Sequence, residues 1–248
     1  MGVITVITSG KGGVGKSTVT AGLAYALTQR GRRVLVMDTD AGLGCLDQIL
    51  DIAEQQVFDL ADVVSGAALP AQAVYSSPWA EGLSVLPAPG REDDIVSPSL
   101  MRQLCSALSR YYDHILIDCP AGIGLGFQSA IAAAQRALVV STPDPVCLRN
   151  SARTRLLLQQ AGITQQRLVV NRFSSAAFRS MKAYEDLDAV IDASGIQLIA
   201  VIPEDFQVPN AFAHSVPAPQ KSPAAMAFGR LAARLEGEQI PLAALHKF

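Results

Sequence analysis

The sequence predicts an α/β fold, with one doubly wound, mostly parallel sheet and helices on both of its faces. Short, nearly continuous apolar runs alternate with Ala- and Leu-rich stretches of helical length along all 248 residues. Such apolar runs are typical of strands buried on both faces, and their alternation with helices indicates βαβ units. Half of the residues are hydrophobic and only 17% are charged. The chain can therefore bury the core of one large domain.

The individual elements follow from the same pattern in chain order. Seven β-branched, apolar runs are predicted to be strands, namely 3–8, 33–37, 83–86, 114–117, 137–141, 168–170 and 198–202. Longer stretches predicted to be helices are 17–29, 98–109, 148–160, 182–193 and 223–235. We expect residues 1–242 to form one domain and residues 243–248 a short tail. Functional loops are expected at the carboxyl ends of the strands.

Composition excludes several classes of protein. With 20 basic and 22 acidic side chains the net charge is −2, which provides no overall attraction to nucleic acid or anionic lipid. No run of ~18 apolar residues could span a bilayer, and the amino terminus lacks the pattern of a signal peptide. The four cysteines and three histidines are scattered, so no zinc site is predicted. We interpret the cysteines as buried thiols in a reducing cytosol.

A phosphate-binding loop is the strongest motif. The pattern GxxxxGK[ST] occurs between an apolar strand and a helix, which is the context that the motif requires and which disfavours a simple glycine-rich turn. Glycines allow successive backbone N–H groups to face phosphate oxygens, and the helix start adds its positive dipole end. Lys16 is expected to bridge the β- and γ-phosphates of ATP, and the Ser17 hydroxyl to ligate Mg²⁺. The loop consists of Gly10, Lys11, Gly12, Gly13, Val14, Gly15, Lys16, Ser17 and Thr18.

Two further loops carry carboxylates at the same edge of the predicted sheet. Asp118 ends an apolar strand, and a carboxylate in this position commonly holds Mg²⁺ through a water molecule. Gly122, four residues later, could offer its N–H to the γ-phosphate. Asp38 and Asp40 end the second strand, where one could assist the metal and the other polarise an attacking water. Alone they would more often be helix caps or turn residues, but their position in a P-loop protein favours the site.

The extra Lys11 makes the loop resemble the deviant Walker A motif of the MinD/ParA family of P-loop ATPases. Segments 38–47 and 118–127 are similar to the switch segments of the MinD branch of that family. Segments 195–205 and 234–241 also resemble that branch. The similarity therefore extends over residues 1 to about 242.

The resemblance implies an eight-stranded sheet and an ATP-dependent homodimer that encloses the nucleotides. Lys11 would reach across the interface to the partner's phosphates, and Asp40 would orient the hydrolytic water. This assignment is physically reasonable, because a second cation interacts strongly with phosphate charge across an interface that excludes water. We therefore predict Lys11, Lys16 and Asp40 as catalytic and Ser17, Asp38 and Asp118 as metal ligands. The residues predicted to border the adenine are Asn171, Arg172, Pro203 and Asp205.

The function implied is a nucleotide-switched ATPase that regulates the site of the division septum together with a regulatory protein partner. A DNA-binding partition ATPase of the ParA type is one alternative, since arginines concentrate in the carboxyl-terminal half. The acidic balance and the lack of a helix-turn-helix segment make DNA the less favoured partner. A relative that positions flagella or other cargo is another alternative. Iron–sulfur relatives are disfavoured because no CxxC pair is present.

The sequence departs from the MinD pattern in three places. Gly44 and Cys45 replace the usual Arg-Asn of the first switch, and the helix around Arg149 lacks two expected aspartates. After Pro241 only seven residues follow, with a single lysine, where the branch has a basic amphipathic helix. We therefore expect weak or no membrane binding. The expected location is cytoplasmic, and peripheral at the inner face of the cell membrane only if a membrane-binding tail was removed.

Overall fold

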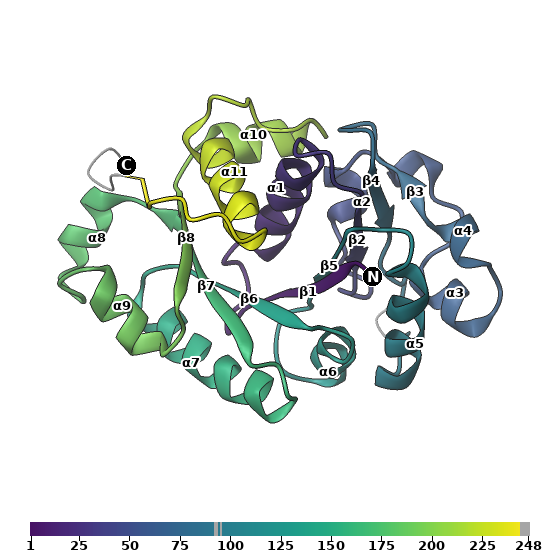
Figure 1. Ribbon diagram of the computed structural model, residues 1–248, viewed down its shortest axis with the longest axis horizontal. Helices are drawn as coiled ribbons and strands as arrows, with labels where there is room; N and C mark the ends of the chain where they lie inside the picture. Colours follow the sequence, from purple (N-terminus) through teal and green to yellow (C-terminus); the bar gives the residue numbers. More distant parts are fainter. Residues whose placement is uncertain (92–93, 95, 244–248) are drawn as a thin grey trace.

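The computed structural model describes residues 1–91, 94 and 96–243, and its sheet has the predicted α/β architecture (Figure 1). The strands within this part of the chain are β1 (Val3–Thr8), β2 (Val34–Asp38), β3 (Tyr75–Ser76), β4 (Leu83–Leu86), β5 (His114–Asp118), β6 (Arg136–Ser141), β7 (Gln165–Phe173) and β8 (Leu198–Pro203). Their order across the sheet is β3-β4-β2-β5-β1-β6-β7-β8. Every described pair is parallel except β3 with β4.

Alternate residues of the strands pack into two separate cores, as a period of two requires. Val34 and Val36 of β2 belong to one cluster, whereas Leu35 and Met37 belong to the other. Both sets are fully buried. The sheet is therefore covered on both faces, which explains why most of its strands are nearly continuous apolar runs in the sequence.

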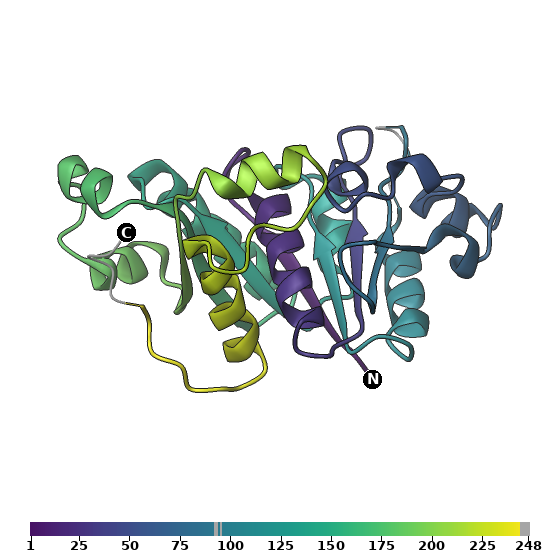
Figure 2. The same ribbon diagram turned by 90° about the horizontal axis from the view of Figure 1, so that it is seen from above.

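Two layers of helices provide that cover (Figures 1 and 2). The first layer contains α1 (Lys16–Thr28), α2 (Leu46–Ile49), α10 (Gln207–Ala213) and α11 (Pro223–Leu235). The second contains α3 (Leu60–Ser65), α4 (Pro70–Ala73), α5 (Pro98–Leu108), α6 (Leu125–Ile131), α7 (Pro145–Gln160), α8 (Ser175–Met181) and α9 (Leu187–Ser194). A single turn of 3₁₀ helix, Ala53–Gln55, follows α2.

Three of the longer helices begin in the same way. The side chains of Ser97, Asp144 and Ser222 each accept an N–H from the third residue of the helix that follows. In each case a proline occupies the first helical position. This combination satisfies one exposed N–H and fixes the entry of the chain. Because of this start signal, α7 begins at Pro145, three residues before the predicted boundary at residue 148.

The predicted helix 182–193 is wrong over its first five residues. Lys182 has a left-handed backbone with φ of 52° and follows the end of α8. Asp186 then caps α9 by accepting the N–H of Ala189 at 2.9 Å. An acidic N-cap residue with an extended backbone starts a helix immediately after itself, so the helix begins at Leu187 and not at Lys182.

No helix in the described part of the chain is both long and apolar enough to cross a membrane. The interpretation of the tail falls largely on residues 244–248, which lie outside the described residues.

Candidate functional site

The predicted phosphate loop connects β1 to α1 at the carboxyl edge of the sheet. Gly15 precedes α1 with φ of 92°, a left-handed conformation that glycine adopts without strain. A Cβ at this position would lie 2.4 Å from Nδ2 of Asn171. That same amide donates a 2.8 Å hydrogen bond to the carbonyl of Val14. The end of β7 therefore holds the loop immediately before the helix that would face phosphate.

The other end of the loop packs against α7. A Cβ on Gly10 would lie 2.4 Å from the backbone of Asn150, so the close approach requires glycine. Lys11 is exposed. Burial raises the pKa of Asp144, but hydrogen bonds from Cys147 and Thr142, with the charge of Lys11, leave it below its ordinary value. Lys11 therefore lies within electrostatic range of the first turn of α7.

The two buried carboxylates, Asp38 and Asp118, are brought side by side by the pairing of β2 with β5. Asp118 accepts a 2.6 Å hydrogen bond from the Ser17 hydroxyl and a 2.9 Å bond from the Thr20 hydroxyl. Burial and the neighbouring Asp38 raise the pKa of Asp118 to about 7. Thr20 was not predicted, although it follows Ser17 by three residues and therefore shares its helix face.

Asp38 also organises the first switch segment. It accepts hydrogen bonds from the backbone N–H groups of Asp40, Cys45 and Leu46 at 3.0 to 3.3 Å. Burial nevertheless raises its pKa to about 6. Gly44 lies so close that a Cβ there would be 2.9 Å from a carboxylate oxygen of Asp38. The glycine that departs from the expected pattern thus allows the segment to wrap tightly around this carboxylate.

This arrangement fits a Mg²⁺ ion that is shared with a phosphate ligand. In the described residues no group of three or more His, Cys, Asp or Glu side chains could hold a metal by itself. Mg²⁺ commonly uses one or two carboxylates, a hydroxyl and the phosphates of its substrate. Ser17, Asp38 and Asp118 provide such an incomplete set, and a divalent cation would offset the repulsion between the two carboxylates.

Asp40 and the second switch complete the same edge. Burial raises the pKa of Asp40 and the charge of Lys16 acts against that change, so the two side chains lie within electrostatic range. A Cβ on Gly12 would lie 3.9 Å from Cβ of Ala121, which places the second switch beside the loop. Gly122, the next residue, is exposed and has φ of 93°.

A cavity of about 420 Å³ opens beside the phosphate loop. The predicted adenine residues all line it, together with Thr18 of the loop helix: Asn171, Arg172, Pro203 and Asp205. Asp205 has an additional role, because its two carboxylate oxygens accept the backbone N–H groups of Gln207 and Ala224. It thereby joins the beginnings of α10 and α11 and shapes the cavity. Phe206 and Phe228, which were not predicted from the sequence, also line it.

Comparison with known proteins identifies the family. Residues 5–218 match the model of the CobQ/CobB/MinD/ParA nucleotide binding domain. The chain belongs to this family. Within it, the chain is 36% identical to the septum site-determining protein MinD of Bacillus subtilis, covering 100% of this chain and 94% of that protein.

Solved structures of the family have the same fold. The MinC:MinD cell division protein complex of Aquifex aeolicus matches with a TM-score of 0.89 and 33% identity, covering 98% of this chain and 99% of that one. MinD of Pyrococcus horikoshii complexed with Mg-ADP matches with a TM-score of 0.85 and 32% identity, covering 96% and 97%. The chain is therefore a MinD-like member of the family, and its mostly parallel eight-stranded sheet is the fold of these relatives.

Proposed function

We propose that this protein binds and hydrolyses ATP with Mg²⁺ and acts as a nucleotide-switched dimer in placing the division septum. The meeting of Ser17, Asp38 and Asp118 beside the phosphate loop is the observation that carries the ATPase assignment. The relatives that are named septum site-determining proteins support the cellular role.

The residues have separate tasks in the proposed hydrolysis. The loop N–H groups and Lys16 hold the phosphates, and Asp40 orients the attacking water. Asp40 lies near enough to Lys16 for the charge of the lysine to affect its pKa. When bound, Mg²⁺ supplies positive charge that stabilises the transferring phosphoryl group. The relative complexed with Mg-ADP supports this choice of ligand.

Dimerisation is supported by apolar side chains that remain exposed at the carboxyl edge. Leu43 of the first switch is 71% exposed, and Ile123 and Leu125 of the second are 57% and 64% exposed. Val146, at the start of α7, is 59% exposed. These side chains and the exposed Lys11 all belong to segments that follow the carboxyl ends of strands, and we propose that a second copy of the chain covers them. Lys11 would then meet the phosphates bound by its partner.

The partner proposed for the dimer is a cell division protein of the MinC kind. The solved MinC:MinD complex, in which MinD is 33% identical to this chain, supports this choice. We propose a cytoplasmic location for the dimer. DNA and membrane surfaces are the competing docking partners, and they are distinguished by experiment.

The test combines assembly with partner binding. Light scattering should show a monomer with ADP and a dimer with ATP, and Asp40→Ala should extend the lifetime of the dimer because water attack is slowed. Co-sedimentation of the ATP-bound dimer with a MinC protein from the same genome, with liposomes of anionic lipid and with duplex DNA identifies the partner. Identical mass with ATP, with ADP and without nucleotide would contradict the dimer. Binding to DNA alone would favour the partition ATPase.

A further inference from the structure

Phe206 is an aromatic side chain in an unusual environment. It is 81% exposed, more than Tyr111, the other exposed aromatic residue in the described part of the chain, which is 66% exposed. Leaving such a ring in water forgoes the free energy of its burial. The ring lies at the cavity beside the phosphate loop, not on a remote surface.

The backbone that carries Phe206 is fixed from several sides. Asp205, the preceding residue, accepts the N–H of Gln207 at 3.0 Å and that of Ala224 at 3.1 Å. The carbonyl of Phe206 itself accepts the N–H of Asn210 at 3.4 Å. The start of α10 is thus tied to itself and to α11. Phe206 is therefore presented from a rigid base, although its ring is free.

The cavity that Phe206 borders has the features of a site for a flat, mostly apolar group. Pro203, Val208 and Phe228 contribute buried apolar surface to it. Arg172 is exposed beside them and has φ of 52°, a conformation that is costly for a non-glycine residue and frequent at functional sites.

The cavity is joined directly to the phosphate loop. Asn171 lines the cavity and also donates its side-chain N–H to Val14 of the loop. Thr18, the residue after Ser17, lines it as well. A ligand with its phosphates on the loop would therefore place the rest of its structure in this cavity.

We propose that Phe206 stacks on the base of the bound nucleotide and supplies much of the affinity that the phosphates do not. This inference rests on the proposed function, because it requires a nucleotide on the phosphate loop. Stacking uses the face of the base and tolerates any base. Phe206 therefore strengthens the binding of ATP and GTP alike.

The test separates the base from the phosphates. Isothermal titration with Mg-ATP and with inorganic tripolyphosphate is applied to the full chain, to Phe206→Ala and to Phe206→Trp. Phe206→Ala should weaken ATP binding about tenfold, which corresponds to about 1.4 kcal/mol, and leave tripolyphosphate binding unchanged. Phe206→Trp should retain ATP binding. The indole that it introduces should change its fluorescence with ATP but not with tripolyphosphate, measured against the background of Trp79, the single native tryptophan.

Tyr111→Ala provides the matched control. Tyr111 is an exposed aromatic residue between α5 and β5, and it therefore lies at the amino edge of the sheet, opposite the site. The Tyr111→Ala variant should bind Mg-ATP and tripolyphosphate with the same affinities as the unmodified chain. The proposal is overturned if Phe206→Ala binds ATP with unchanged affinity, as expected for a ring that serves a protein partner. It is also overturned if ATP and tripolyphosphate are lost equally. If the unmodified chain binds neither ligand, the proposed function itself fails.

Discussion

The Ser17 hydroxyl donates a 2.6 Å hydrogen bond to the Asp118 carboxylate, and so joins the start of α1 to the end of β5. The two residues are 101 positions apart in the chain. Burial next to Asp38 disfavours the charge of Asp118 and raises its pKa to about 7. A cation at this point would reverse that effect. The fold thus holds two carboxylates in an arrangement that favours a divalent ion close to the phosphate loop.

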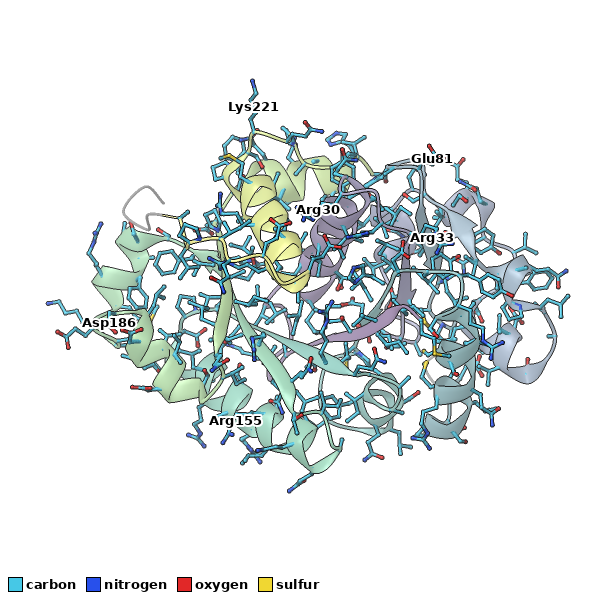
Figure 3. All side chains as sticks on the ribbon, in the orientation of Figure 1. Arg30, Arg33, Glu81, Arg155, Asp186 and Lys221 are labelled. Atoms are coloured by element: carbon cyan, nitrogen blue, oxygen red, sulfur yellow. The ribbon has the colours of Figure 1, made fainter. Side chains whose placement is uncertain are left out.

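Lys16→Ala should abolish measurable ATP binding. We predict that Lys16 is the cation that contacts the β- and γ-phosphates within one chain, and a charge-assisted contact of this kind is strong. Isothermal titration with Mg-ATP measures the effect. Lys221→Ala is the control, because Figure 3 shows Lys221 projecting outward from the segment before α11. Unchanged affinity in Lys16→Ala would contradict the assignment of the phosphate loop.

Lys11→Ala should bind ATP nearly as well as the unmodified chain but should dimerise and hydrolyse it poorly. Lys11 is exposed and therefore accessible to a second copy of the chain, whose phosphates it is proposed to contact. Loss should therefore appear in assembly before it appears in monomer binding. Light scattering and phosphate release measure the two steps. Normal assembly and turnover in this variant would make Lys11 an ordinary surface lysine.

The strands and the phosphate loop could be predicted from the sequence because their signals are local. Burial on both faces makes β1 and β4 nearly continuously apolar, and both occur at the predicted bounds. β3 has only two residues and therefore no pattern, and α10 is a short helix that contains Pro209. Such elements form because tertiary contacts hold them, which no single window of sequence shows.

The candidate site was predictable only in part for the same reason. Motif spacing identified Ser17 and Asp118 but not the second hydroxyl, Thr20, whose hydrogen bond depends on the distance between α1 and β5. Asp205 was assigned to the adenine through resemblance. Its hydrogen bond to the N–H of Ala224, 19 residues away, depends on how α10 and α11 meet. Contacts of this kind require the folded chain.

His114→Gln should make folding stability less dependent on pH below about 7. Burial and the Arg136 guanidinium, 3.4 Å away, lower the pKa of His114, although Glu236 at 3.7 Å acts in the opposite direction. The unfolded chain, with a histidine pKa near 6.5, therefore accepts the proton more readily than the folded one. The free energy of unfolding is therefore highest above the pKa that His114 has in the unfolded chain. It decreases as the pH falls towards the lower pKa that His114 has in the folded chain, by up to ~1.4 kcal/mol per pH unit.

Urea unfolding at pH 7.5, 6.5 and 5.5 measures this difference for His114. The unmodified chain should lose more stability over the range than His114→Gln. His214→Gln is the control, because His214 is exposed and its ring nitrogen lies 2.8 Å from the carbonyl oxygen of Asn210, four residues earlier. Equal pH dependence in all three proteins would show that the environment of His114 does not control its protonation.

Charged pairs also join the end of α1 to the end of α11, away from the phosphate loop at the start of α1. Arg30 contacts both Glu236 and Glu238, and Figure 3 shows it between the two helices. Such partly exposed pairs contribute little individually. The packing of Phe228 on Gly22 is therefore the better point at which to test how α11 is held.

Gly22→Ala should destabilise the protein, although alanine is the better helix former. A Cβ at Gly22 would lie 2.4 Å from the ring of Phe228, and overpacking of a buried contact typically costs ~1–3 kcal/mol, more than the ~1 kcal/mol that the alanine propensity returns. Gly229→Ala on α11 is the matched control, because a Cβ there meets nothing within 4 Å and should stabilise the helix. Phe228→Leu should partly restore Gly22→Ala, since it removes the clashing ring. Thermal unfolding is measured for the unmodified chain, Gly22→Ala, Gly229→Ala and the double variant Gly22→Ala with Phe228→Leu.

Because Phe228 also lines the cavity beside the phosphate loop, Gly22→Ala should weaken ATP binding as well. A Gly22→Ala protein that melts above Gly229→Ala would show that α11 moves away freely and does not hold this wall of the cavity.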